Sequence, residues 1–290
     1  MTEYIKKLLE TDDVELKNSL TSFMKDYTRK SKRLDKTMKH SDKQQLMLFK
    51  MHETISAQKN ELDKIHQYDT QQQVIAKEKL DLAIVDDLEN HEDFKSTVIY
   101  KPADILSGDF YSTHILSDGS LFVYIIDGQG HGISPALTVF AVSSTISHLI
   151  EENISFEEIV NKLFPMIRKF LGEIEQLSFT MIGIDKKYIQ YASGGMYPFM
   201  IKKEEEVITY KANNLPFMNF SPSPVIKSIT IDNWSDMILY TDGLVEDLTE
   251  DMSEYSPLNL LARSDLFEEA KNKIANGIYE DDITVIKISR

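Results

Sequence analysis

The chain has 290 residues, a formal net charge of −15 and 42% hydrophobic residues, so it is long enough for one large domain or two smaller ones. It contains no cysteine, which excludes disulfides, thiolate metal ligands and a cysteine nucleophile. Residues 95–290 hold 16 Lys and Arg against 28 Asp and Glu. Because phosphate backbones require a basic surface, this balance argues against nucleic acid as a partner.

Neither a targeting segment nor a membrane segment is predicted. The first seven residues, Met1 to Lys7, lack the apolar core of a signal peptide. We find no apolar run near the roughly 20 residues that a membrane helix needs. We therefore expect a cytoplasmic protein that does not enter a membrane.

The first 101 residues contain no glycine and no proline, which predicts a largely helical segment. Apolar residues recur there with heptad spacing, at Leu20, Phe23, Tyr27, Leu34, Leu48, Met51, Ile55, Leu62 and Ile65. We expect residues 1–75 to form a coiled coil that makes a homodimer or binds a regulatory protein. The alternative is a helical hairpin folded back on itself within one chain.

Residues 76–95 have a helical pattern up to Phe94 and lead into the first expected strand. A helix between a dimerising rod and a catalytic domain is well placed to act as a switch, and simple linkage is the alternative. The domain organisation that we expect is therefore a coiled coil over 1–75, a linker or switch helix over 76–95 and a folded domain over 96–290.

The folded domain alternates short apolar runs with turn residues. Strands are expected at 97–100, 109–116, 121–126, 178–184, 188–192, 197–201, 206–210, 226–231, 236–241 and 283–288. Helices are expected at 134–150, with Ser134 as the N-cap, at 156–171 and at 257–275. Because helices and strands do not alternate regularly, the pattern favours an α+β fold with stacked sheets covered by helices.

Four aspartates stand at strand ends or in adjoining turns: Asp109, Asp127, Asp242 and Asp281. Asp127 and Asp242 each follow an apolar strand and precede a glycine. Any one of them alone is typical of a turn, but together they predict a shared site. Carboxylate oxygens without cysteine or clustered histidine select hard cations such as Mg²⁺ or Mn²⁺. Two such ions, about 3.5–4 Å apart, could activate water and hold a phosphoryl group.

Four motifs contain these aspartates. In chain order they are Gly108-Asp109-Phe-Tyr111, Asp127-Gly-Gln-Gly-His-Gly132, Tyr240-Thr-Asp242-Gly-Leu-Val-Glu246 and Asp281-Asp-Ile-Thr284. They resemble the signatures of the PPM (protein phosphatase 2C-like) superfamily, and more narrowly its bacterial SpoIIE/RsbU branch of serine phosphatases. The resemblance covers about residues 97–290. It implies an antiparallel β-sandwich between helical layers, and metal-dependent removal of phosphate from phosphoserine or phosphothreonine in a protein.

The resemblance also implies a role for each residue of the motifs. Asp127 would bridge two Mn²⁺ or Mg²⁺ ions, and the Gly128 carbonyl would bind one of them. Asp242 and Asp281 would complete the second metal site, and Asp109 would lie near the first metal, through water.

Three further residues of the motifs have less direct implied roles. His131 is either a proton donor to the leaving serine or a residue that orders its loop. Asp282 would hold the metal ligands in position without binding a metal itself, and Glu246 would have a structural role.

The implied substrate in this branch is a small regulatory protein with a STAS fold that antagonises an anti-sigma factor. We therefore expect a phosphatase that uses metal-activated water without a phosphoenzyme and is regulated through its N-terminal helices. The alternative function is a catalytically silent sensor or scaffold that keeps the phosphatase fold.

Overall fold

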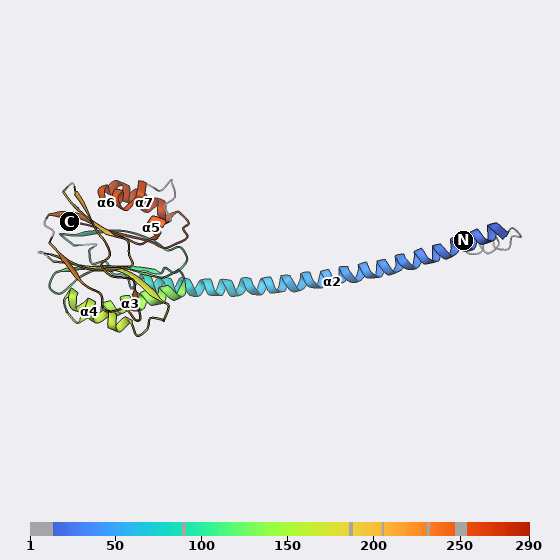
Figure 1. Ribbon diagram of the computed structural model, residues 1–290, viewed down its shortest axis with the longest axis horizontal. Helices are drawn as coiled ribbons and strands as arrows, with labels where there is room; N and C mark the ends of the chain where they lie inside the picture. The colour runs from blue at the N-terminus through green and yellow to red at the C-terminus, as the bar shows by residue number, and fades with distance from the viewer. Residues whose placement is uncertain (1–13, 89–90, 186–187, 205, 231–232, 247–253) are drawn as a thin grey trace. The chain divides into compact units, whose positions relative to one another are not determined.

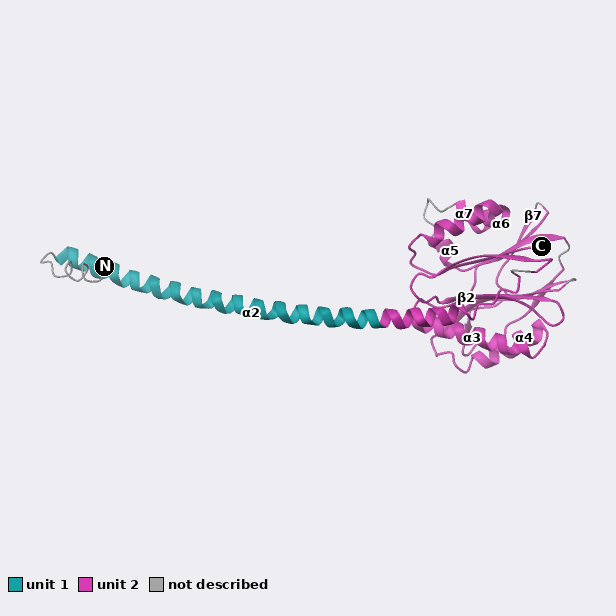
Figure 2. Cartoon of the chain, turned by 180° about the vertical axis from the view of Figure 1, so that it is seen from behind, with its two compact units in different colours: residues 1–68 teal, residues 69–290 magenta. Residues whose placement is uncertain are grey.

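The computed structural model describes residues 14–88, 91–185, 188–204, 206–230, 233–246 and 254–290. By its contacts the chain divides into two compact units, residues 1–68 and residues 69–290, which Figure 2 shows in teal and magenta. The division falls inside one long helix, somewhat before the end of the expected coiled coil at residue 75. The three-part organisation stays a prediction.

The second unit contains two antiparallel sheets. One has the strand order β1-β11-β10-β6-β7, and the other has the order β2-β3-β4-β5-β9, with β8 paired to β4. The strands are β1 Lys95–Lys101, β2 Asp109–Ile115, β3 Leu121–Gly128, β4 Gln176–Ile184, β5 Ile189–Gly194, β6 Phe199–Lys203, β7 Glu206–Tyr210, β8 Phe217–Met218, β9 Lys227–Ile229, β10 Trp234–Tyr240 and β11 Ile283–Ser289.

Helices cover the outer faces of the two sheets (Figure 1). Helices α3 (Ile133–Glu151) and α4 (Phe156–Ile167) pack on the six-stranded sheet. Helices α5 (Gly243–Glu246), α6 (Pro257–Ala262) and α7 (Ser264–Ala275) pack on the five-stranded sheet. The expected α+β class, an antiparallel sandwich flanked by helices and preceded by a long helical segment, is confirmed.

Strand β3 shows why this architecture produces uninterrupted apolar runs. Phe122, Tyr124 and Ile126 point into the core beneath α3 and α4. Leu121, Val123 and Ile125 point the other way, into the core between the two sheets. Because both faces of the strand are covered, neither set of alternating side chains needs to be polar.

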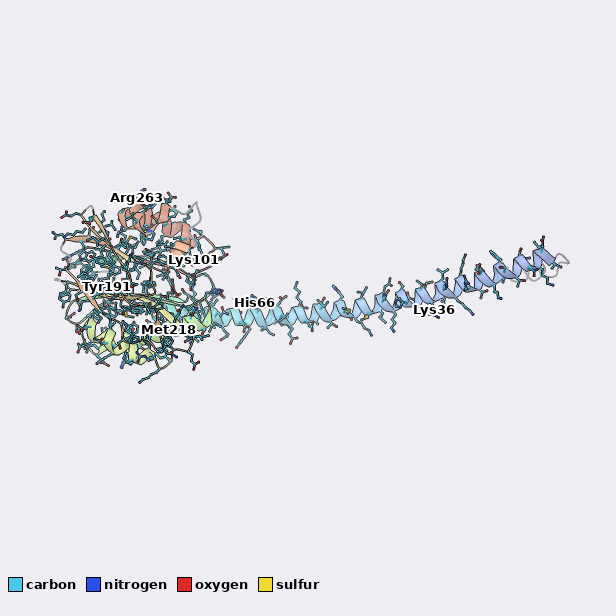
Figure 3. All side chains as sticks on the ribbon, viewed as in Figure 1. Lys36, His66, Lys101, Tyr191, Met218 and Arg263 are labelled. Atoms are coloured by element: carbon cyan, nitrogen blue, oxygen red, sulfur yellow. The ribbon has the colours of Figure 1, made fainter. Side chains whose placement is uncertain are left out.

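The helix α2 (Val14–Asp81) is continuous over 68 residues and has no buried residue. Figure 3 shows its side chains standing out from the ribbon in the first unit, with Lys36 and His66 labelled. The alternative of a helical hairpin is wrong, because the segment does not turn back. Residues 1–13 of the expected coiled coil lie outside the described residues.

The expected helix over 76–94 is correct only as far as Asp81. After two turn-like hydrogen bonds, from Ala83 N to Leu80 O and from Ile84 N to Asp81 O, the chain becomes extended and runs beside β2. Thr113 N donates to Val85 O, and Asp87 N donates to Thr113 O. The prediction failed because β2 offers this segment backbone partners that the helical pattern does not reveal.

Two helix boundaries also differ from expectation. The N-cap of α3 is Gly132, at φ 96°, and not Ser134. The positive φ suits glycine and lets the helix begin one residue earlier. The helix expected over 257–275 is interrupted at Arg263, whose backbone is extended at φ −130° and ψ 111°.

Helix α3 is also long and apolar enough, by length and composition, to cross a membrane. The expectation that no apolar run comes near the length of a membrane helix is therefore wrong for residues 133–151. Six of its residues are buried against the domain, as in the core helix of a folded protein.

Candidate metal centre

The strand ends place four carboxylates at one edge of the sandwich. Asp109, at the start of β2, is the register partner of Asp127, near the end of β3. Strands β10 and β11 are antiparallel neighbours, so the end of one and the start of the other share an edge. Asp242 follows β10, and Asp281 precedes β11.

Asp109 joins the two sheets through its carboxylate. It is almost fully buried, and its Oδ2 atom accepts hydrogen bonds from Thr241 Oγ1 at 2.8 Å and from Thr284 Oγ1 at 2.6 Å. Thr284 N also donates to Thr241 Oγ1, at 3.0 Å. The sequence did not predict either threonine as part of the candidate site, although each stands inside one of the four motifs.

Asp282 acts on the loop before β2. Its Oδ1 accepts from Ala103 N at 2.7 Å, and its Oδ2 accepts from Gly108 N at 2.6 Å. Because both oxygens accept backbone hydrogen bonds, this carboxylate fixes the loop that delivers Asp109.

Two glycines allow the loops of the site to approach each other. Gly128 N donates to Gly108 O at 3.0 Å. A Cβ atom on Gly108 would lie 2.5 Å from the Gly130 carbonyl oxygen and 2.9 Å from the Gly128 carbonyl oxygen. A side chain at position 108 would therefore displace the carbonyl of Gly130 or of Gly128, and the family resemblance implies that the Gly128 carbonyl is a metal ligand.

Burial and neighbouring carboxylates raise the pKa values of Asp127, Asp109 and Asp242. Burial raises the pKa of Asp127 to about 7, and the charges of Asp242 and Asp281 add to this effect. Burial and the charge of Asp127 hold the pKa of Asp109 well above its usual range, although the two threonine hydroxyls act against the rise. Burial, and then the charge of Asp281, raises the pKa of Asp242. The site thus concentrates negative charge at a cost in free energy.

The donor set fits a hard divalent cation. Only oxygen ligands are offered, and among the described residues no cationic side chain forms an ion pair with Asp127, Asp109 or Asp242. Within the same ranges, no three His, Cys, Asp or Glu side chains gather closely enough to enclose one ion. The carboxylates form a looser group, and a cation of the Mg²⁺ or Mn²⁺ type would neutralise its charge.

His131 and Glu246 lie at the margin of this group. His131 is exposed in the loop between β3 and α3, and no hydrogen bond or ion pair joins it to the four aspartates in the described part of the chain. Glu246, at the end of α5, is also exposed, and its charge contributes to the raised pKa of Asp242. The structure therefore does not place His131 in contact with the carboxylates.

The fold and the motifs define the second unit as a PP2C-type serine/threonine phosphatase domain. The family model described as Stage II sporulation protein E (SpoIIE) matches residues 117–290, and the chain belongs to this family. It is 25% identical over 203 residues to the Stage II sporulation protein E of Priestia megaterium. The match covers 64% of this chain and 34% of that protein, so the chain spans about a third of its relative.

Solved structures show the same fold. The SiaA-PP2C domain of Pseudomonas aeruginosa superimposes with a TM-score of 0.61 at 16% identity, covering 78% of this chain and 98% of that one. The PP2C phosphatase domain and regulatory fragment of SpoIIE from Bacillus subtilis gives 0.54 at 19% identity, covering 68% and 63%. The RsbU and RsbW domains of a Mycobacterium tuberculosis protein give 0.53 at 16% identity, covering 68% and 60%.

Proposed function

We propose that residues 96–290 form a protein serine/threonine phosphatase that requires two Mn²⁺ or Mg²⁺ ions. One observation carries the proposal: strands from both sheets bring Asp109, Asp127, Asp242 and Asp281 to one edge. There, burial and neighbouring carboxylates raise the pKa values of Asp109, Asp127 and Asp242, and no cationic side chain among the described residues forms an ion pair with these three. Burying like charges is costly, so such a group is typical of a functional site.

Each residue would have its own task when the ions are bound. Asp127 would bridge the two ions, with help from the Gly128 carbonyl, and Asp242 and Asp281 would hold the second ion. Asp109, fixed by its threonine bonds, would orient a water ligand of the first. The ions would supply an activated water and a clamp for the phosphoryl oxygens. His131 would donate a proton to the leaving serine or order its loop.

The proposed substrate is phosphoserine or phosphothreonine in a cytoplasmic regulatory protein, such as a STAS-type antagonist of an anti-sigma factor. Membership of the SpoIIE family supports this proposal. So does the likeness to structures named as bacterial serine phosphatases.

Metal removal tests the proposed activity. The full chain, with p-nitrophenyl phosphate as the probe, should be inactive in a chelator and recover when Mn²⁺ or Mg²⁺ is restored, because the carboxylates alone offer no electrophile. Initial rates measured across a metal titration check this. Hydrolysis that persists in the chelator, or no hydrolysis with either metal, contradicts the proposal. The second result would favour the alternative of a silent scaffold.

We also propose that α2 regulates the site through its final turns and the extended connector that follows. In the second unit, residues Asp69, Gln72, Gln73 and Ala76 of α2 line a cavity of about 380 Å³ with Leu106 and Ile133. Leu106 belongs to the loop before Asp109, and Ile133 begins the helix after the Asp127 loop. A change in these turns of α2 would therefore reach both loops.

The side chain of Asp86 adds three hydrogen bonds to the backbone bonds that join the connector to β2. The carboxylate of Asp86 accepts from Thr113 Oγ1 at 2.7 Å, from Leu88 N at 3.1 Å and from Ser96 Oγ at 2.5 Å. Thr113 lies on β2, the strand that begins at Asp109. Asp86 thus ties the connector to a strand of the proposed metal site.

Replacing this side chain should loosen the connector. Asp86→Ala leaves three donors without their acceptor, so we expect a loss of about 2 kcal/mol in the free energy of unfolding. Amide exchange over residues 83–88 should be at least about tenfold faster, because the open state gains population. Urea unfolding and exchange mass spectrometry measure both, with Asp93→Ala as the exposed control. Equal exchange in the two variants would show that Asp86 does not hold the connector.

A further inference from the structure

A cleft begins beside the proposed metal centre. It has a volume of about 580 Å³, within the range of clefts that hold ligands. It is lined by Gly128 and Gln129 at the end of β3, by Ser134 and Thr138 of α3, and by Ile174 and Glu175 of the loop before β4. Because the Gly128 carbonyl is a proposed ligand of the metal, the cleft is continuous with the place where a phosphoryl group would be held.

The walls of the cleft have a distinct chemistry. Ile174 is 90% exposed, so its aliphatic side chain is available for contact. Glu175 is the charged residue among those that line the cleft, and its Oε2 accepts from Gly172 N at 2.8 Å. This bond fixes the position of the negative charge. On α3, Ser134 and Thr138 stand one helical turn apart, and Thr138 Oγ1 donates to Ser134 O at 3.2 Å.

We propose that this cleft binds the polypeptide that flanks the phosphorylated residue of the substrate, and that it favours a flank with a lysine or arginine next to an aliphatic side chain. The basic residue would meet Glu175, and the aliphatic residue would cover Ile174. The inference rests on the proposed phosphatase activity. It adds a preference for certain residues next to the phosphorylated residue, which the carboxylates of the proposed metal centre alone cannot provide.

Electrostatics supports a basic flank over an acidic one. Residues 95–290 carry 28 Asp and Glu against 16 Lys and Arg, so the catalytic unit repels acidic peptides in general. No lysine or arginine lines the cleft among the described residues. The phosphoryl group would therefore be bound by the positive charge of the metal ions, and a basic residue of the flank would be bound by the negative charge of Glu175.

The experiment compares three substrates with the full chain in Mn²⁺. They are p-nitrophenyl phosphate, a phosphoserine peptide with lysine and leucine on both sides, and a peptide of equal length with glutamate and serine instead. We expect kcat/KM for the lysine–leucine peptide to be at least about tenfold higher than for the glutamate–serine peptide, and the ratio to fall as salt is added.

Two variants test the cleft itself. Glu175→Gln keeps an acceptor for Gly172 N and removes the charge, and Ile174→Ser removes the apolar contact. Each should lower kcat/KM for the lysine–leucine peptide by about three- to tenfold, with hydrolysis of p-nitrophenyl phosphate within twofold of the wild type. Leu258→Ser and Glu268→Gln, at exposed positions on α6 and α7, are the matched controls, and neither should change kcat/KM for the lysine–leucine peptide or for p-nitrophenyl phosphate.

The outcomes separate this inference from the activity on which it rests. If the wild type hydrolyses p-nitrophenyl phosphate but shows no flank preference, or if both variants keep the full preference, the cleft assignment is overturned and the phosphatase proposal stands. If the wild type with Mn²⁺ hydrolyses none of the three substrates, the proposed activity is overturned and the cleft assignment with it.

Discussion

The variant Asp127→Asn is expected to lose at least about 10³-fold in kcat, because it removes the carboxylate that would bridge both ions. Metal-assisted stabilisation of a transition state is worth several kcal/mol, and each 1.36 kcal/mol is a factor of ten in rate. Initial rates with p-nitrophenyl phosphate in saturating Mn²⁺ measure the loss. Asp118→Asn, in the turn between β2 and β3, is a control of the same chemistry and should keep full activity.

The same variant should make the metal-free protein more stable. Burial raises the pKa of Asp127 to about 7 from an ordinary value of 3.8, so the folded state holds a proton that the unfolded state has lost. Between pH 4 and pH 7 the wild type therefore becomes less stable as the pH rises, and above pH 7 the cost is constant. Asparagine carries no such cost, so Tm of the variant should exceed that of the wild type at pH 8 and approach it at pH 4.

An active Asp127→Asn variant would refute the proposed bridging role. A variant that loses both activity and stability would show only that the loop needs the carboxylate to fold. Loss of activity with a gain in stability is the result expected of a residue kept for function at a cost in folding free energy.

The sequence predicts the edge of the sandwich at which the site forms, because this prediction needs only local sequence patterns. An apolar run that ends on aspartate and glycine identifies the end of a buried strand, and this holds for Asp127 and Asp242 alike. Antiparallel pairing then brings Asp109 opposite Asp127. The resemblance to a known family adds the order of the motifs, and with it the two-sheet architecture.

The supporting hydrogen bonds could not be predicted in the same way. The partners Thr284 and Asp109 are 175 positions apart, and Asp282 and Gly108 are 174 apart. Such pairs depend on how two sheets pack, which no local pattern contains. The prediction of a helix after Asp81 failed for a related reason. The sequence there has a helical pattern, but the backbone of Thr113 offers hydrogen bonds that hold the segment in an extended form.

The other large effect is expected on helix α2, which has no buried residue in the described chain. Leu48 and Ile55, one heptad apart, are 65% and 58% exposed. A helix that exposes such a row is stabilised when a second helix covers it, at about 1.5–3 kcal/mol for each buried side chain. We therefore expect the full chain to be a dimer, and the double variant Leu48→Asp and Ile55→Asp to dissociate it.

The dissociation constant of the dimer should rise at least about 100-fold in this double variant, because each substitution places a carboxylate in an apolar seam. Sedimentation equilibrium measures the change. The double variant Gln45→Asp and His52→Asp adds the same two carboxylates to the same helix outside the Leu48–Ile55 row, and it should remain dimeric. A monomeric wild type, or equal dissociation of both double variants, would mean that the row of apolar residues does not join two copies of the chain. Hydrolysis of p-nitrophenyl phosphate by the monomeric variant would then show how far the metal centre depends on the paired helices.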